Sequence, residues 1–444
     1  MQPTPTPTPT PPERARSHAR AVSGDDRRRV ALPRRSTRGP LDADAHADDP
    51  LAAPHVSPPQ QAVSGQQRVQ SPSRSETDTS AGGDGASAGK DFSFLQDPAA
   101  YHVLSPTNIP PQFLHASTSP SLSSPIDSLL RSGHYRLAAI AAARNIVTAA
   151  SPADHDTLFR LLHIRLACLC LLSEHALAAQ ESKVLGDLNS PFYQQPPTTS
   201  AAHLVPWHLR LLVVRLSALG YGEWRKGIMG YYELARECRE NILQSEAADD
   251  EEKALWKTRL HDCGIRVANV LVEMGDLEGA GRHLASLSST TPSRDVLTME
   301  ALIWLRVGDM RAARRSLSAA SALHSDALVD GTLQALMQLA NGDYPAAVSS
   351  FTALREQFPA DAMLAQNLAV TLLYTGHISQ ARDLLTEIVD ASAPFHALVF
   401  NLSTVYELCT ERNRDRKGAL AGRLAERKGD GSVGWEIGNV DFKL

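Results

Sequence analysis

The sequence lacks the usual signatures of metal-binding, disulfide-linked and membrane-spanning proteins. It has only five cysteines in 444 residues, and none of them forms a Cys-x-x-Cys pair, so neither a zinc site nor a disulfide framework is indicated. We interpret them as small apolar residues of a reducing compartment. No apolar run is long enough to cross a bilayer, and no secretory signal is recognisable. The net charge is −5, and no basic face interleaved with aromatic residues stands out, which argues against nucleic acid as the main partner.

Catalytic and cofactor-binding motifs are also missing. The nearest match to a phosphate-binding loop is Gly83–Lys90, but Asp91 stands where that loop needs serine or threonine, and no strand pattern precedes it. No Gly-x-Ser-x-Gly elbow occurs. The 16 histidines are scattered without the spacing of metal ligands. We therefore predict a protein that is not an enzyme and that takes no cofactor, metal or small-molecule substrate.

Proline is distributed very unevenly. Of the 28 prolines, 19 fall in residues 1–125, and residues 1–90 have almost no aromatic or long apolar side chains, so we predict that residues 1–90 are disordered. Residues 1–40 hold nine arginines against three acidic residues. This pattern favours a solvated regulatory tail, with a nuclear-import or nucleic-acid patch and a transit peptide as alternatives. Serines that precede proline and could accept phosphate are Ser57, Ser71, Ser105, Ser119 and Ser124.

Glycines recur every 34 residues in the C-terminal half, at Gly308, Gly342 and Gly376, and an alanine follows each of them five residues later. Gly275 begins a fourth copy of the same pattern. A period of 34 residues is typical of tetratricopeptide repeats. The predicted fold class is therefore all-α, a tetratricopeptide-repeat α-solenoid of antiparallel helical hairpins. Its signature residues are Gly275, Ala280, Gly308, Ala313, Gly342, Ala347, Gly376 and Ala381.

The physical roles of these positions differ. Each glycine is expected in the tight turn between the two helices of a hairpin, where positive φ is often required. Each alanine is expected where the second helix crosses the first, because a larger side chain there would overpack the crossing. Large apolar residues then fill the interface between successive hairpins. The predicted repeats are 261–293, 294–327, 328–361 and 362–395.

The rest of the chain is organised around these four repeats. Residues 126–260 are expected to form irregular helical hairpins, and residues 396–444 to form C-terminal capping helices and a tail. Residues 91–125 are too apolar for a free linker, yet six prolines forbid a continuous helix. Two interpretations stay open for this segment: it covers the exposed face of the first hairpin, or it is a short linear motif that docks on another protein.

A hairpin array presents a long surface, lined mainly by first helices, to a peptide or a neighbouring subunit. Adaptors that grip a C-terminal carboxylate use lysine, arginine and asparagine on those helices, and only Arg266, Asn269 and Asn367 are of this type here. The sequence therefore favours a more apolar protein contact over a carboxylate clamp. The candidate partner-facing residues are Arg266, Asn269, Gln366, Asn367, Asn401 and Tyr406.

Residues 361–412 resemble the last repeat and the following helix of the trafficking protein particle complex subunit 12 family. The most specific stretch is Leu398–Leu408, with the sequence LVFNLSTVYEL. As in that family, a basic helix follows, over Arg412–Lys428, and the chain ends in Phe442-Lys443-Leu444. The resemblance covers roughly residues 91–444 in architecture and is specific over about 361–444.

The resemblance implies a non-enzymatic scaffold subunit of a multisubunit tethering complex. That complex acts as an exchange factor for a Rab-family GTPase in endoplasmic reticulum-to-Golgi transport and autophagy, so the implied partners are other tethering subunits, with an indirect link to the GTPase. The implied location is cytoplasmic and peripheral to Golgi and intermediate membranes. The alternative is a free-standing tetratricopeptide adaptor of the chaperone or peroxisomal-targeting type, which binds short peptide tails.

Overall fold

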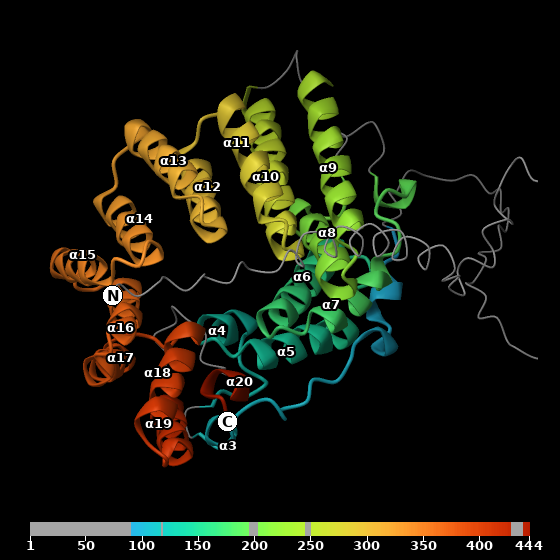
Figure 1. The fold of residues 1–444 in the computed structure, drawn as a ribbon. Helices are drawn as coiled ribbons and strands as arrows, with labels where there is room; N and C mark the ends of the chain where they lie inside the picture. The colour runs from blue at the N-terminus through green and yellow to red at the C-terminus, as the bar shows by residue number, and fades with distance from the viewer. Residues whose placement is uncertain (1–89, 117–118, 195–202, 245–249, 428–437) are drawn as a thin grey trace, which may run out of the picture. The chain divides into compact units, whose positions relative to one another are not determined.

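Helices make up the regular structure of the described residues. The computed structural model describes residues 90–116, 119–194, 203–244, 250–427 and 438–444, and its helices follow one another along the chain in Figure 1. Within these ranges the only β-bridge joins Gln194 to His203. The chain has the predicted all-α fold of a tetratricopeptide-repeat solenoid. Residues 1–89 of the predicted tail lie outside the described residues. They include the basic cluster, Ser57 and Ser71.

Three hairpins precede the regular repeats. The first two and the first helix of the third share one apolar core, and the second helix of the third packs into a separate core with the next repeat. Phe159, Leu162 and Leu166 are fully buried on one face of the second hairpin's first helix, a spacing that puts them on neighbouring turns of one helix face. These hairpins consist of α4 (Ile126–Arg131), α5 (Tyr135–Thr148), α6 (His155–Leu171), α7 (His175–Ser182), α8 (Trp207–Tyr221) and α9 (Trp224–Gln244), with the 3-10 turns η3 (Lys183–Leu185) and η4 (Pro191–Tyr193) after α7.

Four further hairpins follow in the C-terminal half. The first of them starts at Asp250, well before the expected residue 261. Asp250, Glu251 and Glu252 occupy its first turn, where carboxylates stabilise the positive end of the helix dipole, so the acidic stretch begins a helix. The hairpins are α10 (Asp250–Met274) with α11 (Leu277–Thr290), α12 (Arg294–Val307) with α13 (Met310–Leu323), α14 (Ala327–Ala340) with α15 (Tyr344–Gln357), and α16 (Ala362–Tyr374) with α17 (Ile378–Ala391).

Each of these hairpins turns at a glycine in the left-handed region. Gly308, for example, has φ of +92°, which a residue with a Cβ adopts only at a cost. The next residue, Asp309, accepts hydrogen bonds from the amides of Arg311 and Ala312 and so caps the second helix. The corresponding φ values are +90° at Gly275, +79° at Gly342 and +81° at Gly376.

The signature alanines are among the most buried residues of the array. Ala347 on α15 and Ala381 on α17 are both completely inaccessible to solvent, as is Ala280 on α11. Ala313 on α13 is 1% exposed. A side chain larger than a methyl group has no room at these positions without movement of the neighbouring helix.

After the last repeat, residues 396–427 and 438–444 form the helices α18 (His396–Cys409), α19 (Asn413–Glu426) and α20 (Asn439–Phe442). Lys417 on α19 is buried, and its Nζ donates to Glu407 Oε1 at 2.6 Å and to the Lys443 carbonyl at 3.0 Å. One buried ammonium group thus joins α18, α19 and the last residues of the chain.

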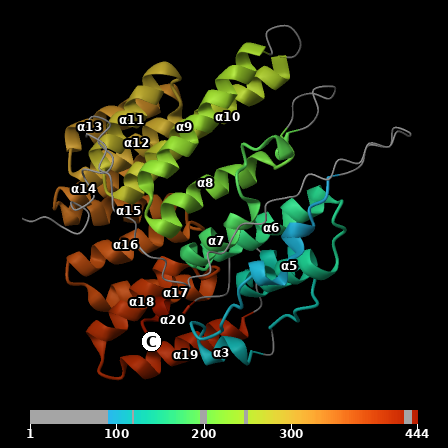
Figure 2. The same ribbon diagram turned by 90° about the vertical axis from the view of Figure 1, so that its right-hand side faces the viewer.

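Residues 90–116, which we call the N-terminal segment, contact both the first hairpins and the last helices. Phe92 and Leu95 lie in the core of the first hairpins. Farther along, the Asn108 carbonyl accepts from the Asn439 amide at 2.7 Å, and the rings of Phe113 and Phe442 lie 6.0 Å apart. The segment contains η1 (Ser93–Gln96), η2 (Pro98–Ala100) and α3 (Pro111–Leu114), and α3 lies beside α19 in Figure 2.

Candidate functional site

An apolar groove of about 450 Å³ opens between α9, α10 and α11. The middle helix, α10, packs against both of its neighbours and contributes Leu260 and Val267. Tyr231 and Tyr232 line the groove from α9, and Leu287 lines it from α11. Tyr231 is 1% exposed while Tyr232 is 45% exposed, so the tyrosine pair supplies both the inner wall and the accessible edge.

A glycine in the middle of α10 brings α11 close to this groove. A Cβ at Gly264 would lie 2.8 Å from the Leu287 side chain, so the glycine permits a close approach of the two helices. His283 of α11 uses this proximity, because its Nε2 lies 3.0 Å from the Gly264 carbonyl oxygen, at hydrogen-bonding distance.

The rim of the groove is basic. Arg239, Lys257, His261 and His283 line it, and no carboxylate of the described residues does. Burial raises the pKa of Tyr231 to about 12, so its hydroxyl stays neutral at physiological pH and donates to the Leu211 carbonyl at 3.3 Å. The groove therefore combines an apolar interior with cationic edges, which suits an apolar protein segment that carries acidic groups.

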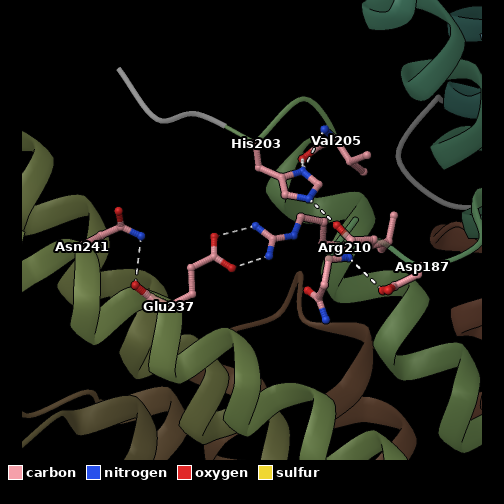
Figure 3. A network of polar contacts seen from close by, with 8 residues as sticks. Asp187, His203, Val205, Arg210, Glu237 and Asn241 are labelled. Carbon is pink, nitrogen blue, oxygen red and sulfur yellow. Dashed lines mark hydrogen bonds and ion pairs between the residues drawn. The ribbon is translucent and has the colours of Figure 1, made fainter. Parts of the chain in front are cut away.

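A neighbouring recess between α8 and α9 is held by the polar network of Figure 3. Arg210 is 4% exposed and faces Glu237, with its Nη1 donating to Glu237 Oε1 at 2.8 Å. Its guanidinium also lies 5.5 Å from the Trp207 ring centre. The bidentate pairing joins α8 to α9, and we assign it a structural role.

The histidine of this network is uncharged at neutral pH. Burial and the nearby Arg210 lower the pKa of His203. His203 Nδ1 accepts from the Val205 amide at 3.0 Å, and Nε2 lies 2.8 Å from the Leu188 carbonyl, so the proton is on Nε2. The imidazole of His203 thus links Val205, just before α8, to Leu188.

The six predicted partner-facing residues lie on three helices. On α10, Asn269 is exposed and Arg266 is half-buried, with its Nε donating to Asp262 Oδ2 at 2.8 Å. Asn367 on α16 and Asn401 on α18 are half-buried. The structure buries Gln366 at 6% exposure and Tyr406 at 9%, because each faces the packed side of its helix. The six residues therefore do not form one exposed surface.

The groove itself was missed by sequence reasoning. It takes two of its three sides from second helices, α9 and α11, whereas we expected contact mainly through first helices. Two signals pointed to it: the adjacent Tyr231 and Tyr232, and a glycine in the interior of a long helix. Neither belongs to the 34-residue pattern.

The described residues offer no cluster of three or more histidine, cysteine or acidic side chains arranged to hold a metal ion. None of the described helices combines the length and hydrophobicity needed to span a bilayer.

Comparison with known proteins finds tetratricopeptide repeats in part of the chain. The tetratricopeptide repeat family model matches residues 338–402. Trafficking protein particle complex subunit 12 of Mus musculus is 25% identical over 313 residues, covering 63% of this chain and 39% of that protein. The Homo sapiens subunit is 26% identical over 304 residues, covering 61% and 41%. The chain thus spans about two fifths of the length of these curated relatives.

Solved helical-repeat structures are more distant. A tetratricopeptide repeat protein from Parabacteroides merdae superposes with a TM-score of 0.38 at 14% identity, covering 61% of this chain and 93% of that one. Yeast Tom70 gives a TM-score of 0.32 at 13% identity, covering 69% and 86%. The repeat-family match and the two curated relatives thus support a tetratricopeptide-repeat protein that is similar to trafficking protein particle complex subunit 12.

Proposed function

We propose that this chain is a non-enzymatic scaffold subunit of a trafficking protein particle (TRAPP)-type tethering complex. The observation that carries the proposal is the similarity to subunit 12, which extends over more than three fifths of this chain. Tetratricopeptide scaffolds of this kind are typically non-enzymes. We further propose that the chain acts in endoplasmic reticulum-to-Golgi transport and autophagy, in the cytoplasm at the surface of Golgi and intermediate membranes.

The proposed contact with another subunit is the groove between α9, α10 and α11. Its apolar lining with Tyr232 at the edge, and its cationic rim with Arg239 and Lys257, match an apolar segment with acidic neighbours. The link to a Rab-family GTPase is indirect, through the assembled complex. Neither nucleic acid nor a small-molecule substrate is part of the proposal.

Affinity purification with mass spectrometry tests this assignment. The tagged chain, expressed at its natural level, is expected to recover the other subunits of a tethering complex in near-stoichiometric amounts. The variant with both Tyr232→Ala and Lys257→Glu is expected to lose at least one of them. Tyr221→Ala is the matched control, because Tyr221 is also 45% exposed but lies outside the groove. Absence of every tethering subunit from the wild-type purification would contradict the proposal.

The second candidate is a free-standing peptide adaptor, and the basic rim of the groove favours it. Such an adaptor would remain monomeric and would bind an isolated acidic peptide without any further subunit. Recovery of a single protein that binds through a short peptide tail, without any tethering subunit, would support the adaptor.

A further inference from the structure

A polar recess of about 640 Å³ lies between α17, α18 and α19, apart from the apolar groove. Three guanidinium groups and three hydroxyl groups line it against a single carboxylate, that of Asp383. The basic and hydroxyl side chains are Arg382, Thr386, Tyr406, Thr410, Arg416 and Arg423.

Helix geometry explains why these side chains converge. Arg382 and Thr386 are four residues apart on α17, and Arg416 and Arg423 are seven apart on α19, so each pair lies on one helix face. Tyr406, on α18, also lines the recess and is 9% exposed. Three helix faces thus direct donors into one recess.

The existing ion pairs leave these arginines available to a ligand. Arg382 Nη2 lies 2.8 Å from Asp383 Oδ1, with 40% and 67% of the two side chains exposed. Arg423 pairs with Asp390, and these side chains are 46% and 61% exposed. Exposed pairs of this kind contribute little and exchange readily with solvent and ions. Arg416 has no ion pair with any residue in the described part of the chain.

We propose that this recess binds the phosphate monoester of a phosphorylated serine or threonine on a partner protein. A phosphate monoester carries close to two negative charges at neutral pH and presents three acceptor oxygens. Planar guanidinium groups donate to such oxygens in pairs. Three arginines and three hydroxyl groups supply many hydrogen-bond donors. A carboxylate has only two acceptor oxygens and a single charge, so this arrangement favours a phosphate monoester over a carboxylate.

A membrane surface fits the recess less well than a single phosphorylated side chain does. Asp383 lines the recess, and Asp390 lies outside the lining on the same helix; both side chains are mostly exposed. A flat anionic surface would bring its charges against both carboxylates. One extended side chain brings a single phosphate to Arg382, Arg416 and Arg423, whose three positive charges outweigh the one carboxylate of the lining, that of Asp383. This proposal does not depend on membership of a tethering complex.

Calorimetric titration of the intact protein with acetyl-phosphoserine-amide tests the proposal. Acetyl-serine-amide, inorganic phosphate and inositol trisphosphate are titrated at the same ionic strength. We expect saturable binding of the phosphoserine compound, no binding of its unphosphorylated form, and weaker binding of the other two anions. The double variant Arg416→Ala with Arg423→Ala is expected to weaken phosphoserine binding at least tenfold.

The matched control removes two arginines of the same region that lie outside the recess lining, in the double variant Arg412→Ala with Arg414→Ala. It is expected to bind like the wild type, and both variants are expected to unfold at the wild-type temperature. Equal weakening of phosphoserine binding in both double variants would show that binding depends on the overall positive charge of the region. That result would overturn the proposed site. Tighter binding of inositol trisphosphate would indicate a lipid head group, and equal binding of free phosphate would indicate a small-anion site. Either result would overturn a phosphorylated protein as the ligand.

Discussion

At the scale of single residues, a buried ion pair determines how the N-terminal segment is held. Arg165 and Glu181 are 1% and 0% exposed and join through Arg165 Nη2 and Glu181 Oε1 at 2.7 Å. The same two groups hold His102 of the N-terminal segment, because Arg165 donates to its carbonyl at 2.7 Å and Glu181 accepts from its amide at 2.9 Å. The pair therefore links α6 and α7 to a segment distant in sequence.

Removing one partner of this pair is expected to be strongly destabilising. Arg165→Met leaves the buried Glu181 carboxylate without its guanidinium partner, and breaking a buried ion pair in this way costs about 3–5 kcal/mol in comparable proteins. Urea unfolding measures the loss. Arg282→Met is the control, because the Arg282–Glu278 pair is 67% and 63% exposed and contributes under about 1 kcal/mol. Equal losses in the two variants would contradict the role of the buried pair.

A histidine pair makes stability depend on pH. The His163 and His208 rings lie 4.4 Å apart, and burial together with His208 lowers the pKa of His163 to about 4. The unfolded chain has an ordinary histidine pKa of about 6.5, so it binds more protons than the folded chain between these two values. Folded stability contributed by this group is complete above about pH 6.5 and is lost as the pH falls toward 4.

Thermal unfolding between pH 7.5 and 5 measures this dependence. The melting temperature is expected to fall with pH, and His163→Gln is expected to make the fall shallower. His115→Gln, at an exposed position, should leave the slope unchanged. A wild-type slope in the His163 variant would show that the pH dependence arises elsewhere.

At the scale of elements, the crossing alanines set the distance between the two helices of a repeat. Ala347→Trp or Ala381→Trp is expected to lower the melting temperature, because overpacking a filled core costs about 1–3 kcal/mol or more. Ala353→Trp is the control on α15, since Ala353 is exposed. Melting temperatures equal to wild type in the Ala347 and Ala381 variants would refute the crossing assignment.

The contact between the N-terminal segment and α20 gives a second test at this scale. Phe442 is completely buried against Phe113, and phenylalanine-to-alanine changes in cores cost about 3–5 kcal/mol. Phe442→Ala is expected to accelerate amide hydrogen exchange in α3 and α18. Val440→Ala, at a residue 74% exposed on the same helix, should leave exchange unchanged. Wild-type exchange in the Phe442 variant would show that these elements do not stabilise each other.

The local pattern of the sequence was enough to predict the repeats, because each turn depends on residues close in the chain. Gly308 and Asp309 carry both the turn and the cap of their hairpin. Long-range contacts were not predictable in this way: no local signal shows that Phe113 meets Phe442, or that His102 is held by Arg165. The burial of Tyr406 was missed for the same reason, since it depends on how α17 and α19 pack beside α18.

At the scale of the whole molecule, the repeat array carries two chemically different surfaces. The groove near Tyr232 is apolar with a cationic rim, and the recess near Arg416 is polar. An array with separate surfaces of this kind suits a subunit that contacts more than one neighbour.

The native size of the chain tests the scaffold assignment most directly. Extract from cells that express the tagged chain at its natural level is separated by size under native conditions, and each fraction is quantified by mass spectrometry. We predict that most of the chain elutes with a large assembly and in constant ratio to other tethering subunits. Elution mainly at the size of the 48.0 kDa monomer, with no tethering subunit in the same fractions, would contradict the scaffold assignment.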